Sequence, residues 1–470
     1  MNKKPSLILI LLLFSLIGCI SNSGDDNTLK FRIPAQWEAH EAIWFGWEEN
    51  SKHYHPIVAD MMQALQGNVN IKVAVKNDSI SQLAKQTLDS LGVDTSAIEM
   101  HPINNQLHWI RDNGAIFGID STQNLAVVDF EWGNYGYIDW YVERNEISDD
   151  ELEQWKNYSV SSPTAKVDSL MGVATKANYL KSTIAIEGGG FEYNGNGVLI
   201  QCEAVTLQRN PGKTKKDIEL EYKKLGIEKV IWLPKGLVED EHIFQYQNGG
   251  YVVGGTGGHT DEFVRFVDEN TILLAWVFED EIEEHPLNRI NYERMLENYK
   301  ILKTSTAING KPFDIIKVPL PRPIEKKVVV KDENDSSTPY TITAFLPKDN
   351  ISVGDTLISI AASSYLNYLV TNGVILMGKY KDYGSADKDE QVRQIFEKIY
   401  PDREIIMLDV LPLNEDGGGG IHCSTIQEPK VSKKTKDLRR EIGDKMLVFN
   451  FLCFQFLWFN FIVALKTGLI

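Results

Sequence analysis

The chain carries the stretch Gly417-Gly418-Gly419-Gly420-Ile421-His422-Cys423-Ser424-Thr425 toward its C-terminal end. Four consecutive glycines allow backbone conformations with positive φ and a close approach of the backbone to another group. Cys423 follows three residues later, in a chain that has only four cysteines. A small substrate could reach a nucleophilic thiol placed behind such a loop. The alternative is a glycine-rich turn followed by a buried structural cysteine, and the stretch alone does not separate the two.

One unit recurs along the chain before this stretch: a polar motif, then two short apolar strands around a turn. Three polar motifs open such units, namely Arg111-Asp112-Asn113-Gly114, Glu187-Gly188-Gly189-Gly190 and His259-Thr260-Asp261. The strands predicted after them cover 115–119 and 125–130, 191–193 and 198–201, and 263–267 and 271–276. Strands at 365–370 and 374–380 form a fourth unit, and residues 420–427 open a fifth. Asn-Gly and Asp/Asn pairs between β-rich runs are good hairpin signals.

Helices are predicted between these units. Apolar residues recur with helical spacing over 79–91, 213–225 and 390–400, and residues 70–75 alternate as a strand does. One or two further helices are expected within 140–180, and the charged stretch 321–350 is expected to be a surface excursion. This alternation predicts an α/β fold. Five hairpin-plus-helix units favour a radial repeat, which places equivalent loops around one axis, over an ordinary mixed sheet.

The N-terminus has the layout of a secretory signal, because Lys3 and Lys4 precede an apolar run over 7–17. The run ends in Leu16-Ile17-Gly18-Cys19, which resembles the bacterial lipobox. We therefore predict a signal peptide over 1–18, a lipid anchor on Cys19, a tether over 19–30, and an exported protein anchored at the bacterial cell envelope. An ordinary signal peptide with an incidental cysteine is the alternative.

The C-terminal tail, residues 430–470, is basic up to 445 and then almost wholly apolar over 446–465. The apolar stretch is long enough for a membrane span. The preceding basic cluster, however, favours a cytoplasmic location for that segment, which conflicts with an exported domain. An interfacial segment, a helix packed on the domain and a non-native extension of the reading frame are the alternatives.

Composition narrows the class of partner. The formal net charge of −17 argues against nucleic acid, whose phosphates need a basic surface, and would favour a cationic substrate. Once Cys19 is set aside, Cys202, Cys423 and Cys453 remain, an odd number with no disulfide framework or zinc-ligand spacing. The sequence contains no indication of oligomeric state.

The polar motifs contain acidic groups, an imidazole and a thiol at equivalent positions of the repeated unit: Asp112, Glu187, His259, Asp261 and Cys423. In a radial fold these groups would converge at the centre. Carboxylates can hold a planar guanidinium by paired hydrogen bonds, a thiolate can attack its carbon, and a histidine can protonate the departing ammonia. Each residue also has a structural interpretation, such as an ion pair between Asp112 and its neighbour Arg111.

The motifs, taken in order, resemble those of the agmatine deiminase and Porphyromonas-type peptidyl-arginine deiminase family, within the guanidine-modifying superfamily. The resemblance covers most of 31–429. It rests on Ile33-Pro34-Ala35-Gln36-Trp37-Glu38, His40-Glu41-Ala42, Trp109-Ile110-Arg111-Asp112, Glu187-Gly188-Gly189, Arg209-Asn210-Pro211, Val230-Ile231-Trp232-Leu233-Pro234, Gly258-His259-Thr260-Asp261, Arg265-Phe266, Tyr365-Leu366-Asn367-Tyr368, Asn372-Gly373 and Gly418-Gly419-Gly420-Ile421-His422-Cys423.

The resemblance implies a deiminase catalytic domain over 31–429, folded as a five-bladed pseudosymmetric α/β propeller (a pentein). It implies that Cys423 is the nucleophile, His259 the general acid and base, and that Asp112 and Asp261 hold the guanidinium. Trp109, Glu187 and Asn367 are implied to bind substrate. The implied reaction passes through a Cys-linked amidino intermediate to a ureido product and ammonia, with no cofactor and no metal.

His422 is an alternative base because it adjoins the cysteine. Adjacent residues of a strand face opposite sides, so we prefer His259 for this role.

The substrate is less well defined than the reaction. The agmatine enzymes usually have Asp-Gly-His where this chain has Gly257-Gly258-His259, and an Asn where it has Gly420. The segment 239–256 is also longer than in the compact enzymes. Agmatine, giving N-carbamoylputrescine for putrescine synthesis, is the preferred substrate, and protein-bound arginine is the alternative. A third hypothesis, against which the intact Cys, His and Asp set argues, is a non-catalytic lipoprotein that binds cations.

Overall fold

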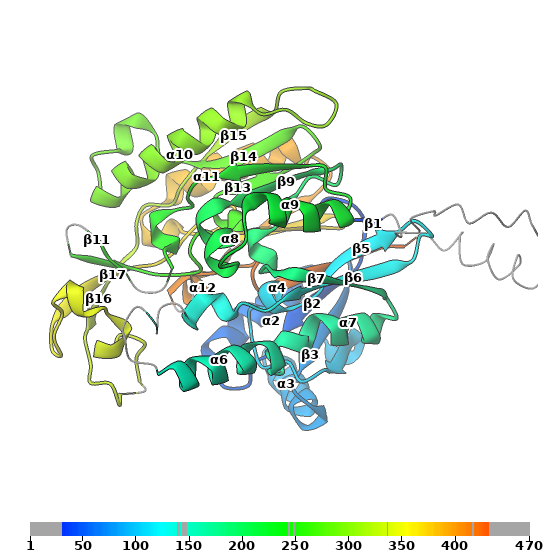
Figure 1. Ribbon diagram of the computed structural model, residues 1–470, viewed down its shortest axis with the longest axis horizontal. Coiled ribbons are helices and arrows are strands. Elements are labelled where there is room, and N and C mark those ends of the chain that lie inside the picture. The colour runs from blue at the N-terminus through cyan, green and yellow to red at the C-terminus, as the bar shows by residue number, and fades with distance from the viewer. Residues whose placement is uncertain are drawn as a thin grey trace, which may run out of the picture.

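Short strands alternate with helices along the chain and assemble into small sheets. The computed structural model describes residues 31–138, 142, 148–242, 245–247, 250–335, 337–415 and 418–431. These residues form a single mixed α/β domain (Figure 1). Two regions discussed above lie outside the described residues. One holds the predicted signal peptide, Cys19 and the tether, and the other is the C-terminal tail beyond Lys430 and Val431.

Five of the sheets share one construction, in which an antiparallel pair is extended by a parallel strand. The first sheet contains β1 (Phe31–Arg32), β5 (Ile116–Asp120), β6 (Leu125–Glu131) and β7 (Asn178–Ala185), and the second contains β8 (Glu192–Tyr193), β9 (Val198–Cys202) and β10 (Lys229–Leu233). The third contains β13 (Val264–Phe266), β14 (Thr271–Trp276) and β15 (Asp314–Pro319), and the fourth contains β18 (Leu369–Thr371), β19 (Val374–Lys379) and β20 (Glu404–Asp409). The fifth contains β21 (Thr425–Pro429), β2 (His40–Gly46), β3 (Asn70–Val75) and β4 (Ile98–Pro102). The predicted hairpins and the strand at 70–75 are thereby confirmed.

The last sheet joins the two ends of the domain. Strand β21 pairs antiparallel with β2, so that Thr425 lies opposite Phe45. Cys423, two residues before β21, is thereby held beside the first long strand of the domain. No hydrogen-bonded ladder joins one sheet to the next among the described residues, so the five-bladed propeller stays a prediction.

A sixth sheet was not predicted. Strands β11 (Gln245–Gln247), β12 (Tyr251–Val253), β17 (Thr356–Ile360) and β16 (Glu325–Val329) form it. The stretch 321–350, expected to be a surface excursion, is exposed over much of its length, but it also contributes β16 to this sheet. Val330, Tyr340 and Phe345 are buried in a small apolar cluster with Val252.

The helices follow the predicted pattern. They are α2 (His55–Leu65), α3 (Asp78–Ser90), α4 (Ile110–Asn113), α6 (Asp149–Ser161), α7 (Val167–Thr175), α8 (Glu203–Arg209), α9 (Lys215–Lys224), α10 (Pro286–Thr304), α11 (Ala386–Ile399) and α12 (Leu411–Glu415). The helices expected over 79–91, 213–225 and 390–400 are α3, α9 and α11, and the stretch 140–180 holds α6 and α7. Within the part of the chain that is described, no helix has both the length and the apolar character of a membrane span.

The strand predicted over 365–370 begins later than expected, since β18 covers only Leu369–Thr371. Tyr365, Leu366 and Tyr368 are fully buried, and the intervening Asn367 makes polar contacts near Cys423 instead of joining a ladder. Long-range packing therefore overrides the local β pattern at this point.

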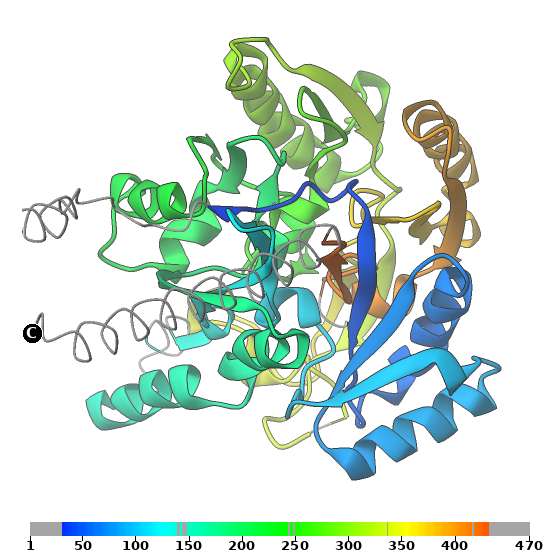
Figure 2. The same cartoon turned by 90° about the vertical axis from the view of Figure 1, so that its right-hand side faces the viewer.

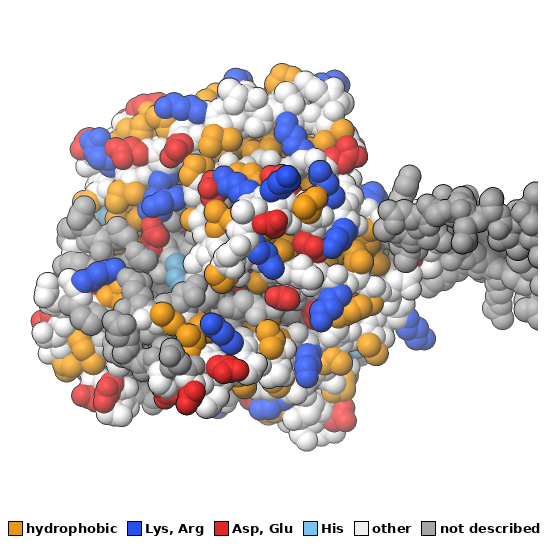
Figure 3. Space-filling model, in the orientation of Figure 1, with side chains coloured by type: hydrophobic (Ala, Val, Ile, Leu, Met, Phe, Trp, Pro, Cys, Tyr) orange, Lys and Arg blue, Asp and Glu red, His pale blue; other side chains and the backbone are white. Residues whose placement is uncertain are grey.

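Helices lie mainly at the periphery, and the ends of the sheets point toward the middle of the molecule (Figure 2). The largest core cluster, which includes Phe45, Trp276 and Phe396, lies between these helices and their sheets. On the face seen in Figure 3, acidic and basic side chains are interspersed over the surface.

Candidate active site

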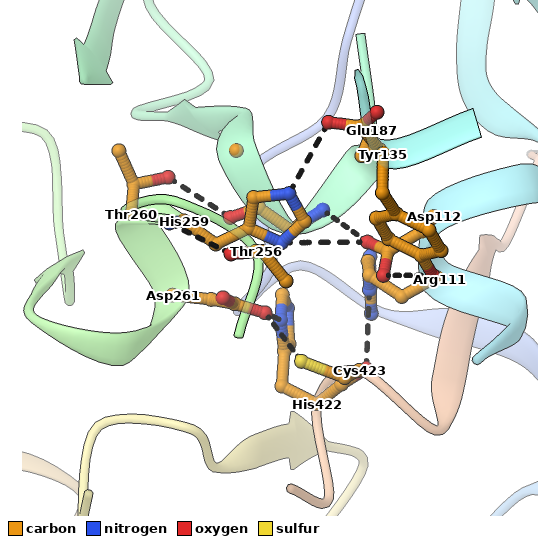
Figure 4. Close-up of polar contacts among 12 residues, drawn as sticks. Arg111, Asp112, Tyr135, Glu187, Thr256, His259, Thr260, Asp261, His422 and Cys423 are labelled. Carbon is orange, nitrogen blue, oxygen red and sulfur yellow. Dashed lines mark hydrogen bonds and ion pairs between the residues drawn. The ribbon is translucent and has the colours of Figure 1, made fainter. Parts of the chain in front are cut away.

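The loops that precede the strands bring the predicted residues together (Figure 4). Asp112 lies on the one-turn helix α4, and Glu187 precedes the 3-10 helix η5 (Gly188–Gly190). His259 precedes a second such helix, η7 (Thr260–Glu262), which carries Asp261. Cys423 lies in the turn before β21. All five side chains are at least nine-tenths buried.

Gly189 shows how closely these groups approach one another. A Cβ atom at this position would lie 2.5 Å from Nδ1 of His259, 3.0 Å from Oδ1 of Asp112 and 3.1 Å from Oδ2 of Asp261. Three polar atoms from two other segments, α4 and the loop that carries η7, therefore surround one glycine. Only a residue without a side chain leaves room for them.

His259 lies between two carboxylates. Its Nε2 is 3.3 Å from Oε2 of Glu187, and its Nδ1 is 3.7 Å from Oδ1 of Asp112. Burial opposes the charged ring, but Asp112 and Glu187 outweigh it and raise the pKa of His259 to about 9. The ring is therefore a cation at neutral pH, which suits a group that donates a proton to a leaving amine.

Glu187 contacts both His259 and Arg209. Its carboxylate accepts hydrogen bonds from Nε of Arg209 at 2.9 and 3.2 Å. Burial alone would raise the pKa of Glu187, but Arg209 and His259 lower it to about 2, so the residue stays ionised. Glu187 is therefore placed to orient His259 and not to line the cavity described below.

The sulfur of Cys423 has two polar neighbours. Nδ2 of Asn367 lies 3.0 Å from Sγ, and Oδ2 of Asp261 lies 3.3 Å from it. Burial, followed by the charges of Asp261, Asp112 and Glu262, raises the pKa of the Cys423 thiol well above its usual range. The thiol of the free protein is therefore protonated, and an additional positive charge is needed to ionise it.

Asn367 holds the loop that carries the cysteine. Its Oδ1 accepts hydrogen bonds from the backbone N–H groups of His422 (2.9 Å) and Cys423 (3.3 Å), and its Nδ2 also donates to Oε1 of Glu262 (2.6 Å). Gly420 fits against this amide, because a Cβ there would lie 2.7 Å from Oδ1 of Asn367. The close approach of Asn367 thus explains why glycine stands at position 420, where the agmatine enzymes usually have Asn.

A cavity of about 310 Å³ leads to this group. Its described lining consists of Leu107, Trp109, Asp112, Trp132, Asn134, Tyr135, Tyr137, Thr164, Gly255, Thr256, Gly419 and Cys423. Trp109, Asp112 and Cys423 thus share one cavity, as predicted for a substrate pocket. Gly419 makes this possible, because a Cβ at this position would lie 2.5 Å from the ring of Trp109.

Three contributors were not predicted from the sequence. The hydroxyl of Tyr135 donates to Oδ2 of Asp112 at 2.9 Å and lines the cavity. Asp240 accepts hydrogen bonds from the backbone N–H groups of Gly258 and His259 and so fixes the loop of the histidine. Arg209 belongs to a motif noted above, but its partner was not foreseen. The aromatic and glycine cluster at 132–136 is the one signal that could have indicated Tyr135.

His422 does not lie where the strand argument placed it. Residues 421–424 form a turn, so adjacent side chains need not face opposite sides. Nδ1 of His422 is 2.7 Å from Oδ2 of Asp261, the same oxygen that faces Cys423. The reason given for setting His422 aside is therefore wrong.

Two of the buried polar atoms that have no hydrogen-bond partner in the described part of the chain belong to this site: Nδ1 of His259 and Oδ1 of Asp261. Both come from the group around Gly189, and buried polar atoms normally have partners. A guanidinium supplies N–H donors for the carboxylate oxygen, and a leaving amine could take a proton from the imidazole.

Asp261, Glu262 and Cys423 offer three donor atoms within 4.8 Å of one another, close enough for one cation. One sulfur and two oxygen donors form too small a set to define a metal preference, and we assign no metal to it.

Comparison with solved structures defines the class of fold. The agmatine deiminase of Enterococcus faecalis superposes with a TM-score of 0.62 at 22% identity, covering 85% of this chain and 96% of that one. A substrate-bound C. jejuni agmatine deiminase superposes with a TM-score of 0.59 at 20% identity, covering 86% and 97%. The chain therefore has the α/β fold of the agmatine deiminases.

Comparison of sequences defines the family. An agmatine deiminase of Pseudomonas aeruginosa is 27% identical over 416 residues, which cover 86% of this chain and 96% of the relative. An agmatine deiminase of Medicago truncatula is 26% identical over 428 residues, covering 85% and 97%. The model of the Porphyromonas-type peptidyl-arginine deiminase family matches residues 32–429. The chain belongs to this family, and it is a hydrolase acting on guanidine C–N bonds.

Proposed function

We propose that the protein converts the guanidine group of agmatine to a ureido group, releasing ammonia and N-carbamoylputrescine. The observation that carries this proposal is the convergence of four groups. His259, Asp112 and Asp261 surround Gly189, and Cys423 contacts Asp261 and shares one cavity with Asp112. The names of the relatives, which are agmatine deiminases from bacteria and a plant, support the choice of substrate.

The roles of the residues follow from their positions. Asp112 and Asp261 accept hydrogen bonds from the guanidinium, whose positive charge lowers the pKa of the Cys423 thiol. Sγ then attacks the guanidinium carbon, a C–S bond forms, and a C–N bond breaks as His259 gives a proton to the departing ammonia. Water attacks the S-linked carbon with His259 as base, the C–S bond breaks, and the ureido product leaves. Glu187 orients His259, Asn367 holds Cys423, and Trp109 packs on the substrate.

The lining of the cavity favours agmatine over free arginine. Asp112 is its charged member, and no Lys or Arg stands among the described lining residues. The carboxylate of free arginine would therefore lose water without gaining a partner. The ammonium of agmatine can instead lie against the aromatic side chains of Trp132 and Tyr137.

Protein-bound arginine is the second candidate, and the family description favours it. A peptide also lacks the free carboxylate that the cavity cannot neutralise. A protein-bound arginine would have to enter a cavity whose lining includes Trp132, Tyr137 and Thr164.

One assay separates the candidates. Ammonia and ureido product would be measured with agmatine, L-arginine and an arginine amide blocked at its N-terminus, using the full chain. We expect the highest kcat/KM with agmatine and none with Cys423→Ala. A higher kcat/KM with the blocked amide than with agmatine would identify protein-bound arginine as the substrate. Binding of guanidines without turnover would favour the non-catalytic hypothesis.

Two further proposals concern the architecture and location. We infer that the five similar sheets surround one axis as a propeller, supported by their shared strand order. We also infer that Cys19 carries lipid and holds the enzyme at the cell envelope, supported by the Leu16-Ile17-Gly18-Cys19 pattern. Release of the Cys19→Ser protein from membranes would support the anchor, and retention would point to the C-terminal tail.

A further inference from the structure

His422 lies in a chain of contacts that fixes where its protons are. Nε2 of His422 is 2.8 Å from Oε1 of Gln36, and Nδ1 is 2.7 Å from Oδ2 of Asp261. The imidazole is fully buried, so water does not supply alternative partners. Each ring nitrogen therefore has to satisfy the one polar atom that faces it.

Arginines determine the orientation of the Gln36 amide. Nη2 of Arg265 lies 2.7 Å from the same Oε1 of Gln36, and an arginine can only donate. The atom of Gln36 that faces it must then be the oxygen. Gln427 donates to this oxygen as well, and its own amide is oriented by Arg111, which donates to Oε1 of Gln427.

Because Gln36 presents an acceptor, Nε2 of His422 must carry a hydrogen. A neutral imidazole with its hydrogen on Nε2 has a lone pair on Nδ1. That lone pair faces the carboxyl oxygen of Asp261 at 2.7 Å, a distance that two acceptors do not keep without a proton between them. The His422–Asp261 pair therefore holds one shared proton, either as imidazolium with carboxylate or as imidazole with carboxylic acid.

The charged and titratable groups around the pair come from several elements. They are Arg111 and Asp112 on α4, His259 before η7, Glu262 on η7, Arg265 on β13, and Cys423. Burial, together with Arg111, Arg265 and His259, lowers the pKa of His422 well below its usual range. Burial raises the pKa of Asp261 to about 6. Both shifts favour the uncharged arrangement of the pair, imidazole with carboxylic acid, so the shared proton belongs to Asp261 before the thiol ionises.

We propose that this pair accepts the proton of the Cys423 thiol, with His422 acting through Asp261 as a positioning residue for the nucleophile. Oδ2 of Asp261 faces both Sγ, at 3.3 Å, and Nδ1 of His422. The S–H bond breaks and its proton forms an O–H bond at Asp261, while the shared proton forms the N–H bond of His422. The result is a thiolate, a carboxylic acid at Asp261 and an imidazolium at His422, so the net charge of the buried site does not change.

The test measures the ionisation of Cys423 directly and needs no turnover. Alkylation of Cys423 by iodoacetamide would be followed against pH in the full chain, with the peptide that contains Cys423 quantified by mass spectrometry. Asparagine at position 422 can donate a hydrogen bond but cannot take up a proton. We expect His422→Asn to raise the pH at which alkylation is half-maximal by at least about one unit, which means about tenfold slower reaction below it.

A second variant leaves His422 in place. Gln36→Leu removes the acceptor, so that His422 can keep a single hydrogen on Nδ1 and the pair loses its extra proton. We expect the same upward shift. An unchanged half-maximal pH in Gln36→Leu would overturn the proposal, even if His422→Asn failed to fold.

His40→Asn is the matched control. His40 is also buried and contacts a neutral partner, Oγ1 of Thr371, at 3.1 Å. Its removal should leave the alkylation profile unchanged, and a shift in this variant would show that the effect is not specific to His422. The proposal rests on Cys423 being the nucleophile of the proposed deiminase. If the wild-type protein does not turn over guanidines but the variants shift the alkylation profile, the proposed deiminase function is refuted and the proton-sharing pair is retained.

Discussion

The sulfur of Cys423 lies 3.3 Å from the carboxylate of Asp261, so the proposed nucleophile and a proposed substrate-binding acid are in direct contact. A carboxylate beside a buried thiol disfavours the thiolate, and Asp112 and Glu262 add to this effect. The bound guanidinium would reverse it by bringing a positive charge to the same acids. The acids therefore disfavour the thiolate in the free protein, and a bound cation would favour it.

The first prediction is that Cys423 prefers a cationic alkylating agent. 2-Chloroacetamidine and 2-chloroacetamide have nearly the same size but differ in charge. We expect the amidine to modify Cys423 at least about tenfold faster at pH 7, a difference of ~1.4 kcal/mol in activation free energy. Asp261→Asn should narrow this ratio. Equal rates for the two agents in the unmodified protein would contradict the charge requirement.

The second prediction concerns the acids that hold the guanidinium. Asp112→Asn keeps the shape of the side chain but removes its charge, and with it a charge-assisted hydrogen bond of about 1.5–3 kcal/mol. We expect kcat/KM for agmatine to fall at least about tenfold. The hydroxyl of Tyr135 also contacts this carboxylate, so Tyr135→Phe should give a smaller loss. A Tyr135→Phe enzyme more impaired than Asp112→Asn would contradict the assignment.

The third prediction tests Asn367 as a support of the nucleophile. Asn367→Asp replaces the donor that faces Sγ by an acceptor, so the thiolate loses a hydrogen bond and meets another negative charge. We expect kcat/KM to fall about 100-fold, with a higher half-maximal pH of Cys423 alkylation. Asn298→Asp is the control, since Asn298 is equally buried and donates to the backbone oxygen of Lys235 on a different element. It should lose stability but keep activity.

The fourth prediction is a pH dependence of stability through His259. Its pKa rises from 6.5 to about 9 on folding, so its protonated form stabilises the folded state. This contribution to the free energy of unfolding is fully present below pH 6.5 and is lost as the pH rises through about 9. Each unit by which folding raises the pKa corresponds to about 1.4 kcal/mol. The free energy of unfolding, measured in urea for the wild type and His259→Asn, should differ by an amount that shrinks over this range.

Glu187→Gln provides the companion experiment. Removal of this carboxylate lowers the pKa of His259, so the loss of stability should move to lower pH. The alkaline limb of kcat should move in the same direction, because His259 must be protonated to release ammonia. A difference between wild type and His259→Asn that does not vary with pH would refute the assigned protonation state.

The fifth prediction uses two neighbouring glycines. In Gly189→Ala the new methyl group would lie 2.5 Å from Nδ1 of His259 and close to Asp112 and Asp261, so these groups must move apart. In Gly190→Ala the nearest atom, Cδ2 of His259, is at an ordinary 3.6 Å. We expect at least about 100-fold loss of kcat/KM in the first variant, since small misplacements in a site cost that much, and near-normal kinetics in the second.

Much of the architecture could be read from local patterns. The turns at 194–197 and 371–373 carry Asn-Gly pairs and do form hairpins, and the helix over 390–400 is α11. Local chemistry determines these elements, because turn residues and apolar spacing act over a few neighbours. The sheet that contains β16 was missed, since its strands meet through pairings distant in the sequence.

The residues predicted to form the site lie close together, whereas the contacts that each of them makes were not predicted, and their roles stay predictions. Cys423, His259, Asp112 and Asp261 do converge, and of these Cys423 and Asp112 line the cavity. Glu187 contacts His259, and Asn367 contacts Cys423. Tyr135 was missed because its local sequence carries no catalytic pattern. The expectation about His422 failed because it assumed an extended strand where the chain turns.

The sequence by itself determined the chemical inventory, since residue types set which groups can attack, donate or hold a cation. It also determined the hairpins and helices, which depend on near neighbours. Only the tertiary structure decided which hydrogen bonds those groups make. The proton on Nε2 of His422 depends on Gln36, which is 386 residues away in the chain. Hydrogen bonds act between atoms in contact, and folding alone brings these atoms together.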